Sequence, residues 1–241
     1  MKSFIRIAAL VVFIVSCAGL AYYYVQDYID DRHQAEIDAL RGMQDVEIPD
    51  VLSEYAALYN ENYDTIGWLK IEGTNIDNVV MYAPHIYEKY LRTDFYGEHN
   101  TRGCLYIAEN CDIFKSDNLI IYGHNMSDGS MFGTLMNFVK ESFYEEHKTF
   151  TFDTIYEKQT YEVVAAIKTA IPPADADVFR YYEYVGEDDA EMFSQYVSFI
   201  EENRLYDTGV ELQEGDSILT LSTCAYHTDQ GRFILVARKI S

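Results

Sequence analysis

Cys224 is the side chain in this sequence best suited to covalent chemistry. It follows a segment rich in β-branched and apolar residues, 217–223, which we expect to be a strand. Arg232 comes eight residues later and begins a second apolar segment, 232–240, after a polar linker that ends in glycine. Neighbouring strands joined in this way would hold the thiol and the guanidinium close enough to act on one carbonyl group. The thiol alone is ambiguous, because free cysteines are often buried and behave as small apolar residues.

A second segment supplies an imidazole. Residues 118–122 are a short apolar strand that stops at Gly123, and His124 lies on the turn that follows, where loops carry functional side chains. A thiol, an imidazole and a guanidinium, each at a strand end, predict nucleophilic acyl transfer. The thiolate would attack a carbonyl carbon, the imidazole would move protons, and the guanidinium would stabilise the oxyanion.

Together these residues resemble the sortases, the transpeptidases that attach proteins to Gram-positive cell walls. The sortase signature Thr-Leu-x-Thr-Cys is present at 220–224, the family histidine matches His124 within Tyr-Gly-His-Asn, and the family arginine matches Arg232. The resemblance spans roughly residues 66–241. It implies an eight-stranded closed β-barrel, a cysteine transpeptidase activity with Cys224, His124 and Arg232 as catalytic residues, and no cofactor.

Arg238 is the alternative to Arg232 as the catalytic guanidinium. It lies six residues further on, so the period of two in a strand puts both arginines on the same face. Six residues of strand cover about 20 Å, which carries Arg238 towards the far end. We therefore expect Arg232 to be the residue that acts beside the thiol.

The long segment before the Cys224 strand points to one class of the family. Residues 172–215 separate the strands 160–169 and 217–223, and within them 188–203 has apolar residues at helical spacing. A helix in this insertion, together with N-terminal helices, resembles class B sortases. That resemblance implies cleavage of a Thr-x bond in an Asn-Pro-x-Thr-x-like sorting signal of a surface protein through a thioester. The acyl group would pass to an amine of peptidoglycan or of its lipid-linked precursor.

Three alternatives remain open from the residues themselves. The acceptor amine is not encoded in a motif, so a pilin-polymerising sortase is one alternative. A cysteine protease that uses water as the acceptor is a second, although such enzymes usually complete the Cys-His pair with Asn or Asp rather than Arg. The third is a surface-binding module that has the barrel fold and no catalysis.

Four further residues are candidates for substrate binding by the same resemblance. Ser222 and Tyr122 match polar and aromatic residues that line the class B groove, Leu91 is a candidate apolar wall, and Thr223 directly precedes the nucleophile. For each of them, ordinary core packing is the competing interpretation. Tyr87 stands where the family often has Asn, four residues before this Leu. Because of this departure from the family pattern, the pocket for the leading Asn of the signal is implied only by the resemblance and is identified by no residue here.

The N-terminus predicts a membrane anchor. Residues 7–25 are uncharged and mostly apolar, which is long enough for a helix to cross a bilayer core. Lys2 and Arg6 precede this run and acidic residues follow it, so we expect a cytoplasmic N-terminus and an extracellular catalytic domain. Residues 1–26 would then be a single-pass anchor. A cleaved signal peptide and a lipid on Cys17 are the alternatives, but the uncharged run continues past Cys17 and favours the anchor.

A helical region should connect the anchor to the barrel. We expect 27–65 to hold two helices that act as a stalk and a packing element. The first helix is predicted over 27–45. The second is predicted over 50–60, with Asp50 as its N-terminal cap.

Short strands with turn signals begin at residue 66 and predict a mainly β domain over 66–241, either a closed barrel or a sandwich. A further helix is predicted at 130–139. The expected strands are 66–72, 77–82, 103–108, 118–122, 149–153, 160–169, 217–223 and 232–240.

Charge and cysteine content limit the remaining function classes. The formal net charge is −22 with only 18 Lys and Arg residues, which argues against nucleic acid as a partner. The histidines lack the ligand spacing of a zinc site, so no metal is expected. Cys104 and Cys111 could form a disulfide in an exported chain or remain two unpaired thiols, and the sequence leaves both readings open.

Overall fold

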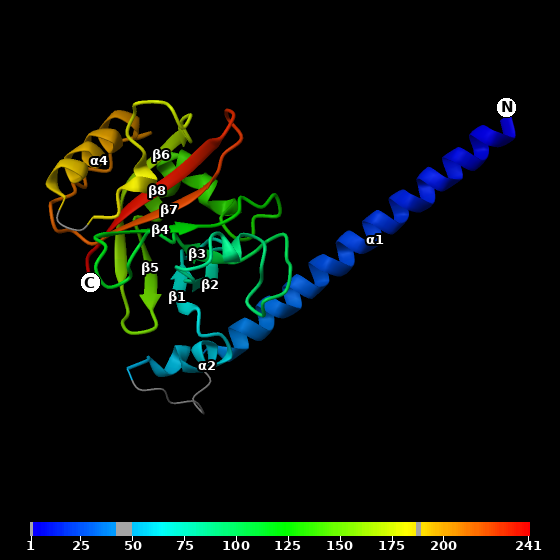
Figure 1. The fold of residues 1–241 in the computed structure, drawn as a ribbon, viewed down its shortest axis with the longest axis horizontal. Helices are drawn as coiled ribbons and strands as arrows, with labels where there is room; N and C mark the ends of the chain where they lie inside the picture. Colours follow the sequence, from blue (N-terminus) through cyan, green and yellow to red (C-terminus); the bar gives the residue numbers. More distant parts are fainter. Residues whose placement is uncertain (1, 42–49, 187–188) are drawn as a thin grey trace.

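Eight strands close into a barrel in the computed structural model, which describes residues 2–41, 50–186 and 189–241 (Figure 1). The strand order around the barrel is β1-β2-β3-β4-β7-β8-β6-β5. This confirms the predicted closed barrel, and every strand overlaps its predicted segment. The strands are β1 (Thr65–Lys70), β2 (Asp77–Met81), β3 (Leu105–Ile107), β4 (Asn118–Tyr122), β5 (Thr149–Thr154), β6 (Thr160–Ala170), β7 (Ile218–Cys224) and β8 (Gly231–Lys239).

The strand directions gather three strand ends at one edge of the barrel. β4 and β7 are parallel neighbours, so both end at the same edge. β8 is antiparallel to β7 and therefore begins where β7 ends. The residues that follow β4, end β7 and begin β8 must consequently lie together.

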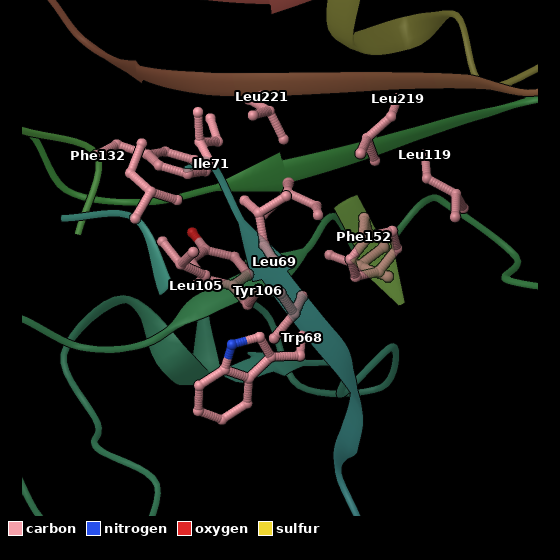
Figure 2. Packing of buried hydrophobic residues seen from close by; sticks show 14 of the residues in the cluster. Trp68, Leu69, Ile71, Leu105, Tyr106, Leu119, Phe132, Phe152, Leu219 and Leu221 are labelled. Carbon is pink, nitrogen blue, oxygen red and sulfur yellow. The ribbon is translucent and has the colours of Figure 1, made fainter. Parts of the chain in front are cut away.

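Alternation along β7 and β8 separates a barrel interior from an outer face. Leu219, Leu221, Phe233 and Leu235 belong to the interior cluster and are fully buried. Figure 2 shows Leu219 and Leu221 directed into the same interior as Leu69. The intervening positions of both strands therefore point to the outer face of the barrel.

The segment between β6 and β7 covers this outer face. Its helix α4 (Ala190–Asn203) buries Tyr196 and Ile200 in a second cluster with outward-facing residues of β7 and β8 (Figure 1). The Asp189 side chain accepts a hydrogen bond from the Met192 amide at 3.0 Å and caps the helix. The predicted helix over 188–203 is therefore present from Ala190, and residue 188 lies outside the described residues.

A buried polar chain joins α4 to β7 and β4. Tyr196 Oη lies 2.6 Å from Thr220 Oγ1, which donates to Asn118 Oδ1 at 2.8 Å. Because the single hydroxyl hydrogen of Thr220 goes to Asn118, Tyr196 is the donor to Thr220. Asn118 Nδ2 donates to the Tyr184 carbonyl at 2.7 Å, so one amide side chain ties β4, β7 and the covering segment together.

We expect Asn118→Leu to lower the free energy of unfolding by about 2–4 kcal/mol, because it leaves the buried Thr220 hydroxyl and Tyr184 carbonyl unpaired. Urea denaturation of the detergent-solubilised chain, followed by fluorescence of the single tryptophan, Trp68, measures this change. Tyr196→Phe is the matched control. It removes only the hydroxyl at the end of this series of hydrogen-bonded side chains, so it should lower the free energy of unfolding by about 1 kcal/mol. Equal midpoints for Asn118→Leu and the parent would contradict this role.

The N-terminal region is one long helix followed by a short one. α1 (Lys2–Leu40) unites the predicted anchor with most of the helix predicted over 27–45, whose last residues lie outside the described part of the chain. Its apolar part extends away from the barrel with exposed side chains, whereas Ile37 is buried near its other end (Figure 1). The segment Arg6–Leu40 has the length and composition to cross a membrane, a test that a signal sequence also passes.

The predicted cap at Asp50 is wrong. α2 (Ser53–Glu61) begins after Leu52, and no side chain caps it. The Leu52 amide donates to the Ile155 carbonyl at 2.7 Å, so the chain is tied to the turn after β5 just before the helix starts. Asp50 instead has a left-handed backbone with φ of 64°.

The helix predicted at 130–139 is present only from Gly133, and as a 3₁₀ helix. This helix, Gly133–Val139, is followed by α3 (Glu141–Glu146), which the sequence analysis did not predict. The first residues cannot join a regular helix because Ser130 is bonded to Asp128 and Met131 has a left-handed φ of 49°.

Candidate active site

Cys224 and Arg232 are direct partners in the antiparallel pairing of β7 and β8. One position beyond them, the Ala225 amide donates to the Gly231 carbonyl at 2.9 Å. Cys224 and Arg232 are therefore a non-hydrogen-bonded pair, in which opposite Cα atoms are roughly 4.5 Å apart and side chains are closest. Both side chains are partly exposed, so the thiol and the guanidinium share the outer face at the end of β7.

His124 lies level with Cys224 because β4 and β7 run in parallel. Tyr122 pairs with Ser222, and the Gly123 amide continues the ladder with a 3.2 Å bond to the Ser222 carbonyl. One residue after His124, Asn125 Nδ2 donates to the Cys224 carbonyl at 2.8 Å. The turn with the imidazole is thus fastened to the backbone of the residue with the thiol.

The contact of the imidazole with Leu91 fixes its tautomer. His124 Nε2 lies 2.8 Å from the Leu91 carbonyl oxygen, which can only accept a hydrogen bond. Nε2 therefore carries a hydrogen, and Nδ1 is the nitrogen that can take up or release a proton. Leu91 ends a 3₁₀ helix, Lys89–Leu91, so a segment far away in the sequence orients the ring.

Arg232 and Arg238 have different surroundings on the same strand. Arg232 Nη1 donates to its neighbouring Gly231 carbonyl at 3.1 Å. Arg238 lies opposite Ile218, at the other end of β7, where its Nη2 pairs with Glu162 at 3.2 Å. The structure thus brings Arg232 to Cys224 and leaves Arg238 in an ion pair far along the strand.

Three tyrosines lie near the thiol and the guanidinium: Tyr106 and Tyr181 are buried, and Tyr122 is partly exposed. The rings of Tyr106 and Tyr122 are 5.7 Å apart. Burial raises the pKa of Tyr181 to about 12, against the Ser222 hydrogen bond and the Arg232 charge, which lower it, while Cys224 adds to the increase. Tyr181 is bonded to Ser222, which shares the outer face of β7 with Cys224, so its ring lies beside the thiol and the guanidinium. Partial burial lowers the local dielectric constant and so strengthens the interaction of a guanidinium with an oxyanion.

The residues predicted to bind substrate fall into two groups. Ser222 is 1% exposed and its Oγ lies 2.8 Å from Tyr181 Oη. Thr223 is 2% exposed and its Oγ1 donates to the Gly123 carbonyl at 2.7 Å. In this structure both hydroxyls hold neighbouring backbone or side chains, so a peptide would reach Ser222 only after Tyr181 moves. Tyr122 and Leu91 are partly exposed at the site, and substrate contact by any of the four stays a prediction.

Two residues at the site, Asn125 and Tyr181, carry no signal of their role in the sequence. Asn125 follows His124 directly, but its bond to Cys224 depends on the pairing of β4 with β7, about a hundred residues apart. Tyr181 lies within the long insertion, where no motif marks it. Only the position of Asn125 next to the histidine could have drawn attention to it.

The remaining cysteines contrast with Cys224. Cys104 and Cys111 are both buried free thiols, so the structure favours the unpaired reading over the disulfide. Burial raises the pKa of Cys111 to about 12, and it raises that of Cys104 further. Neither thiol is suited to act as a thiolate nucleophile. Within the described ranges, no group of three or more His, Cys, Asp or Glu residues could hold a metal ion.

Comparison with known proteins gives consistent matches. The family model of the Sortase domain matches residues 69–240. Sortase B of Staphylococcus aureus (strain NCTC 8325 / PS 47) is 29% identical over 248 residues, covering 100% of this chain and 98% of that protein. Among solved structures, sortase B from B. anthracis in complex with AAEK1 has a TM-score of 0.77 and 26% identity, covering 90% of this chain and 99% of that chain. A Staphylococcus aureus sortase B-substrate complex has a TM-score of 0.72 and 28% identity, covering 90% and 97%.

Proposed function

The chain belongs to the sortase family, class B, whose members are cysteine transpeptidases, and we propose that it cleaves a Thr-x bond in a sorting signal and transfers the acyl product to a cell-wall amine. One observation carries the proposal. The pairing of Cys224 with Arg232 and the parallel ending of β4 bring thiol, guanidinium and the His124 imidazole to one edge. These are the groups needed to form and resolve a thioester.

The first half of the reaction forms the acyl-enzyme. The Cys224 thiolate attacks the carbonyl carbon of the Thr-x bond, and the electron pair of that carbonyl moves to its oxygen. Arg232 stabilises the oxyanion with its positive charge and donors. As the oxyanion collapses, the C–N bond breaks, and the imidazolium of His124 gives its proton to the leaving amine. The products are a thioester on Cys224 and a free amine.

The second half transfers the acyl group. An amine of peptidoglycan or of its lipid-linked precursor attacks the thioester carbonyl and forms a second oxyanion at Arg232. The neutral His124 takes a proton from the attacking nitrogen through Nδ1, the nitrogen that the Leu91 contact leaves for this task. The C–S bond then breaks and returns the thiolate. The outcome is an amide bond between the surface protein and the acceptor, with no net oxidation or reduction.

The substrate proposal is an Asn-Pro-x-Thr-x-like signal. A similar structure is described as a sortase B-substrate complex, which supports a peptide-binding groove in this fold. Tyr122 and Leu91 are the candidate groove residues with exposed surface beside the site. Tyr87, at the position where the family often has Asn, is 79% exposed. The leading Asn of the proposed signal is therefore assigned to no particular side chain of the site.

The apolar part of α1 supports a location at the cell membrane. Residues 1–26 would form a single-pass anchor with its N-terminus in the cytoplasm, and 66–241 would be the extracellular catalytic domain. The continuity of α1 from the apolar run to Leu40 supports an uncleaved anchor, because the same helix that would span the membrane also packs on the barrel. A signal peptide or a lipid on Cys17 would still put the barrel outside.

The contact of His124 also bears on the protease alternative. Cysteine proteases commonly orient the histidine with an Asn or Asp side chain. Here His124 Nε2 contacts a backbone carbonyl, and the Asn125 side chain is bonded to Cys224 instead. This arrangement favours the transpeptidase over a protease.

Product analysis tests the acceptor. We expect the detergent-solubilised chain with a Thr-containing signal peptide and an added oligoglycine or diaminopimelate amine to yield the ligated peptide. The amine should also raise turnover, because it resolves the thioester faster than water. Mass spectrometry distinguishes ligated from hydrolysed product. Hydrolysed peptide alone, formed at the same rate with and without amine, would favour the protease.

A further inference from the structure

Arg102 connects α1 to the loop 124–132, which we call the His124 loop. It lies between the 3₁₀ helix at Leu91 and β3, and its side chain is 13% exposed. From α1 it meets Asp27 at 2.5 Å, Asp30 at 3.4 Å and Asp31 at 3.4 Å. Its Nη2 also pairs with Asp128, in the loop after His124, at 3.1 Å. One guanidinium thus joins carboxylates from two separate parts of the fold.

Asp128 uses its two oxygens for different purposes. Oδ1 accepts hydrogen bonds from the Ser130 amide at 2.9 Å and the Ser130 hydroxyl at 2.7 Å, which shape the loop. Oδ2 faces Arg102. Burial acts to raise the pKa of Asp128, but the Ser130 bonds and the Arg102 charge outweigh it and lower that pKa. The carboxylate is therefore ionised at neutral pH and holds the loop on one side and the guanidinium on the other.

Backbone and side-chain hydrogen bonds connect this loop to both His124 and Cys224. The Phe132 amide donates to the His124 carbonyl at 2.9 Å and closes the loop. Asn125 and Met131 form an isolated backbone bridge across it, and the Asn125 side chain reaches the Cys224 carbonyl. A displacement at Asp128 would thus move the loop that sets His124 against Cys224.

The positive charge of Arg102 stabilises the contact between α1 and the barrel. A cavity of about 400 Å³ lies between α1 and the barrel, and Arg102 and all four of its carboxylate partners line it. Without the guanidinium, the α1 carboxylates would face Asp128 across this cavity as like charges, which repel each other. Burial acts to lower the pKa of Arg102, yet these carboxylates raise it above its usual value. The ion pairs therefore favour the docked arrangement of α1.

We propose that Arg102 is a positioning residue, which holds the membrane-proximal part of α1 and the His124 loop as one unit and so keeps the imidazole in line with the thiol. Catalysis would then depend on whether the anchor helix is docked on the barrel. This inference deepens the proposed function and rests on it for its effect on turnover. Its effect on the loop is independent of the substrate.

The test compares Arg102→Met with Arg41→Met in the detergent-solubilised full chain. Arg41 also fastens α1 to the barrel, since it lies over Trp68 at 4.5 Å and pairs with Asp77 at 3.4 Å, but it makes no contact with the His124 loop. For Arg102→Met we expect faster amide hydrogen exchange in 124–132. We also expect a fall in kcat of about 10- to 100-fold with little change in KM, because small misplacements of a catalytic group carry this cost. For Arg41→Met, loop exchange and kcat should stay near the parent values.

A second pair of variants distinguishes loss of the Arg102–Asp128 ion pair from a folding defect. Asp128→Asn keeps an oxygen for Ser130 but removes the charge that faces Arg102, so it should reproduce part of the loss. Combined with Arg102→Met, its effect should be less than additive, because both changes break one connection. Parent-like loop exchange in both single variants would overturn the proposal. So would an equal kcat loss in Arg41→Met and Arg102→Met.

The two readouts separate this inference from the proposed function. Hydrogen exchange needs no peptide, so the loop can respond to Arg102→Met even if the parent forms no thioester. In that case the proposed function fails while the connection stands. If the parent forms the thioester and Arg102→Met does so at the same rate, Arg102 is not a positioning residue and the proposed function stands.

Discussion

Cys224→Ala will leave a folded barrel that forms no thioester and has lost transpeptidation by a factor of about 10⁴ or more, since a nucleophile cannot be replaced by its neighbours. Cys224 is at the partly exposed end of β7, and alanine keeps the backbone pairing with Arg232. The measurement is turnover of a fluorescent signal peptide together with the intact mass of the protein.

A matched control separates this effect from the loss of any thiol. Cys17 is exposed on α1, in the apolar run far from the site, so Cys17→Ala should keep parent turnover. Turnover by Cys224→Ala at the parent rate would show that another group is the nucleophile.

Arg232→Ala will reduce kcat by about 100- to 1000-fold, the usual cost of removing one donor to an oxyanion. KM should change little, because the interaction with the guanidinium strengthens as charge develops on the oxygen. Arg232→Lys should recover only part of the loss, since an ammonium keeps the charge but not the planar set of donors. Steady-state kinetics with the same peptide measure all three enzymes.

Arg238→Ala is the control on the same strand and face. It breaks the ion pair with Glu162, so some stability will be lost, but turnover should stay close to that of the parent. A loss of kcat in Arg238→Ala equal to that in Arg232→Ala would contradict the assignment of the oxyanion-stabilising role to Arg232.

The strands could be predicted because their signals are local. The side chains of β7 and β8 point alternately into the barrel interior and towards the outer face, which the segment between β6 and β7 covers. Both faces of these strands are therefore rich in apolar residues, and the polar linker between the strands marks the turn. The spacing of Cys224 and Arg232 then gives their pairing directly. The helix in the long insertion could be predicted for the same reason, since its apolar side is continuous and Asp189 caps it.

Contacts between distant segments could not be predicted in this way. The level position of His124 depends on the parallel pairing of β4 with β7, and its orientation depends on the Leu91 carbonyl. The expected Asp50 cap failed because a backbone bond from Leu52 to the turn after β5 decides where α2 begins. Arg102 carried no signal, because its partners come from α1 and from the His124 loop.

The burial of Ser222 and Thr223 illustrates the same limit of local patterns. A resemblance to groove residues names positions, but it does not show that Tyr181 covers one hydroxyl and the Gly123 carbonyl binds the other. The Thr223 hydroxyl is bonded to the carbonyl of Gly123, the residue before His124, and so stabilises the backbone that carries the imidazole. In the same way, the Ser222 hydroxyl is bonded to Tyr181, in the segment between β6 and β7 that covers the outer face of the barrel.

The most direct test of a thiol, an imidazole and a guanidinium acting at one edge of the barrel is to trap the acyl-enzyme. The full chain in detergent is incubated with a library of Thr-containing pentapeptides without added amine, then digested and mapped by mass spectrometry. We expect an adduct on Cys224 whose mass corresponds to the peptide cut after Thr. Cleavage of the peptides with no adduct on Cys224, or with the adduct on Cys104 or Cys111, would contradict it.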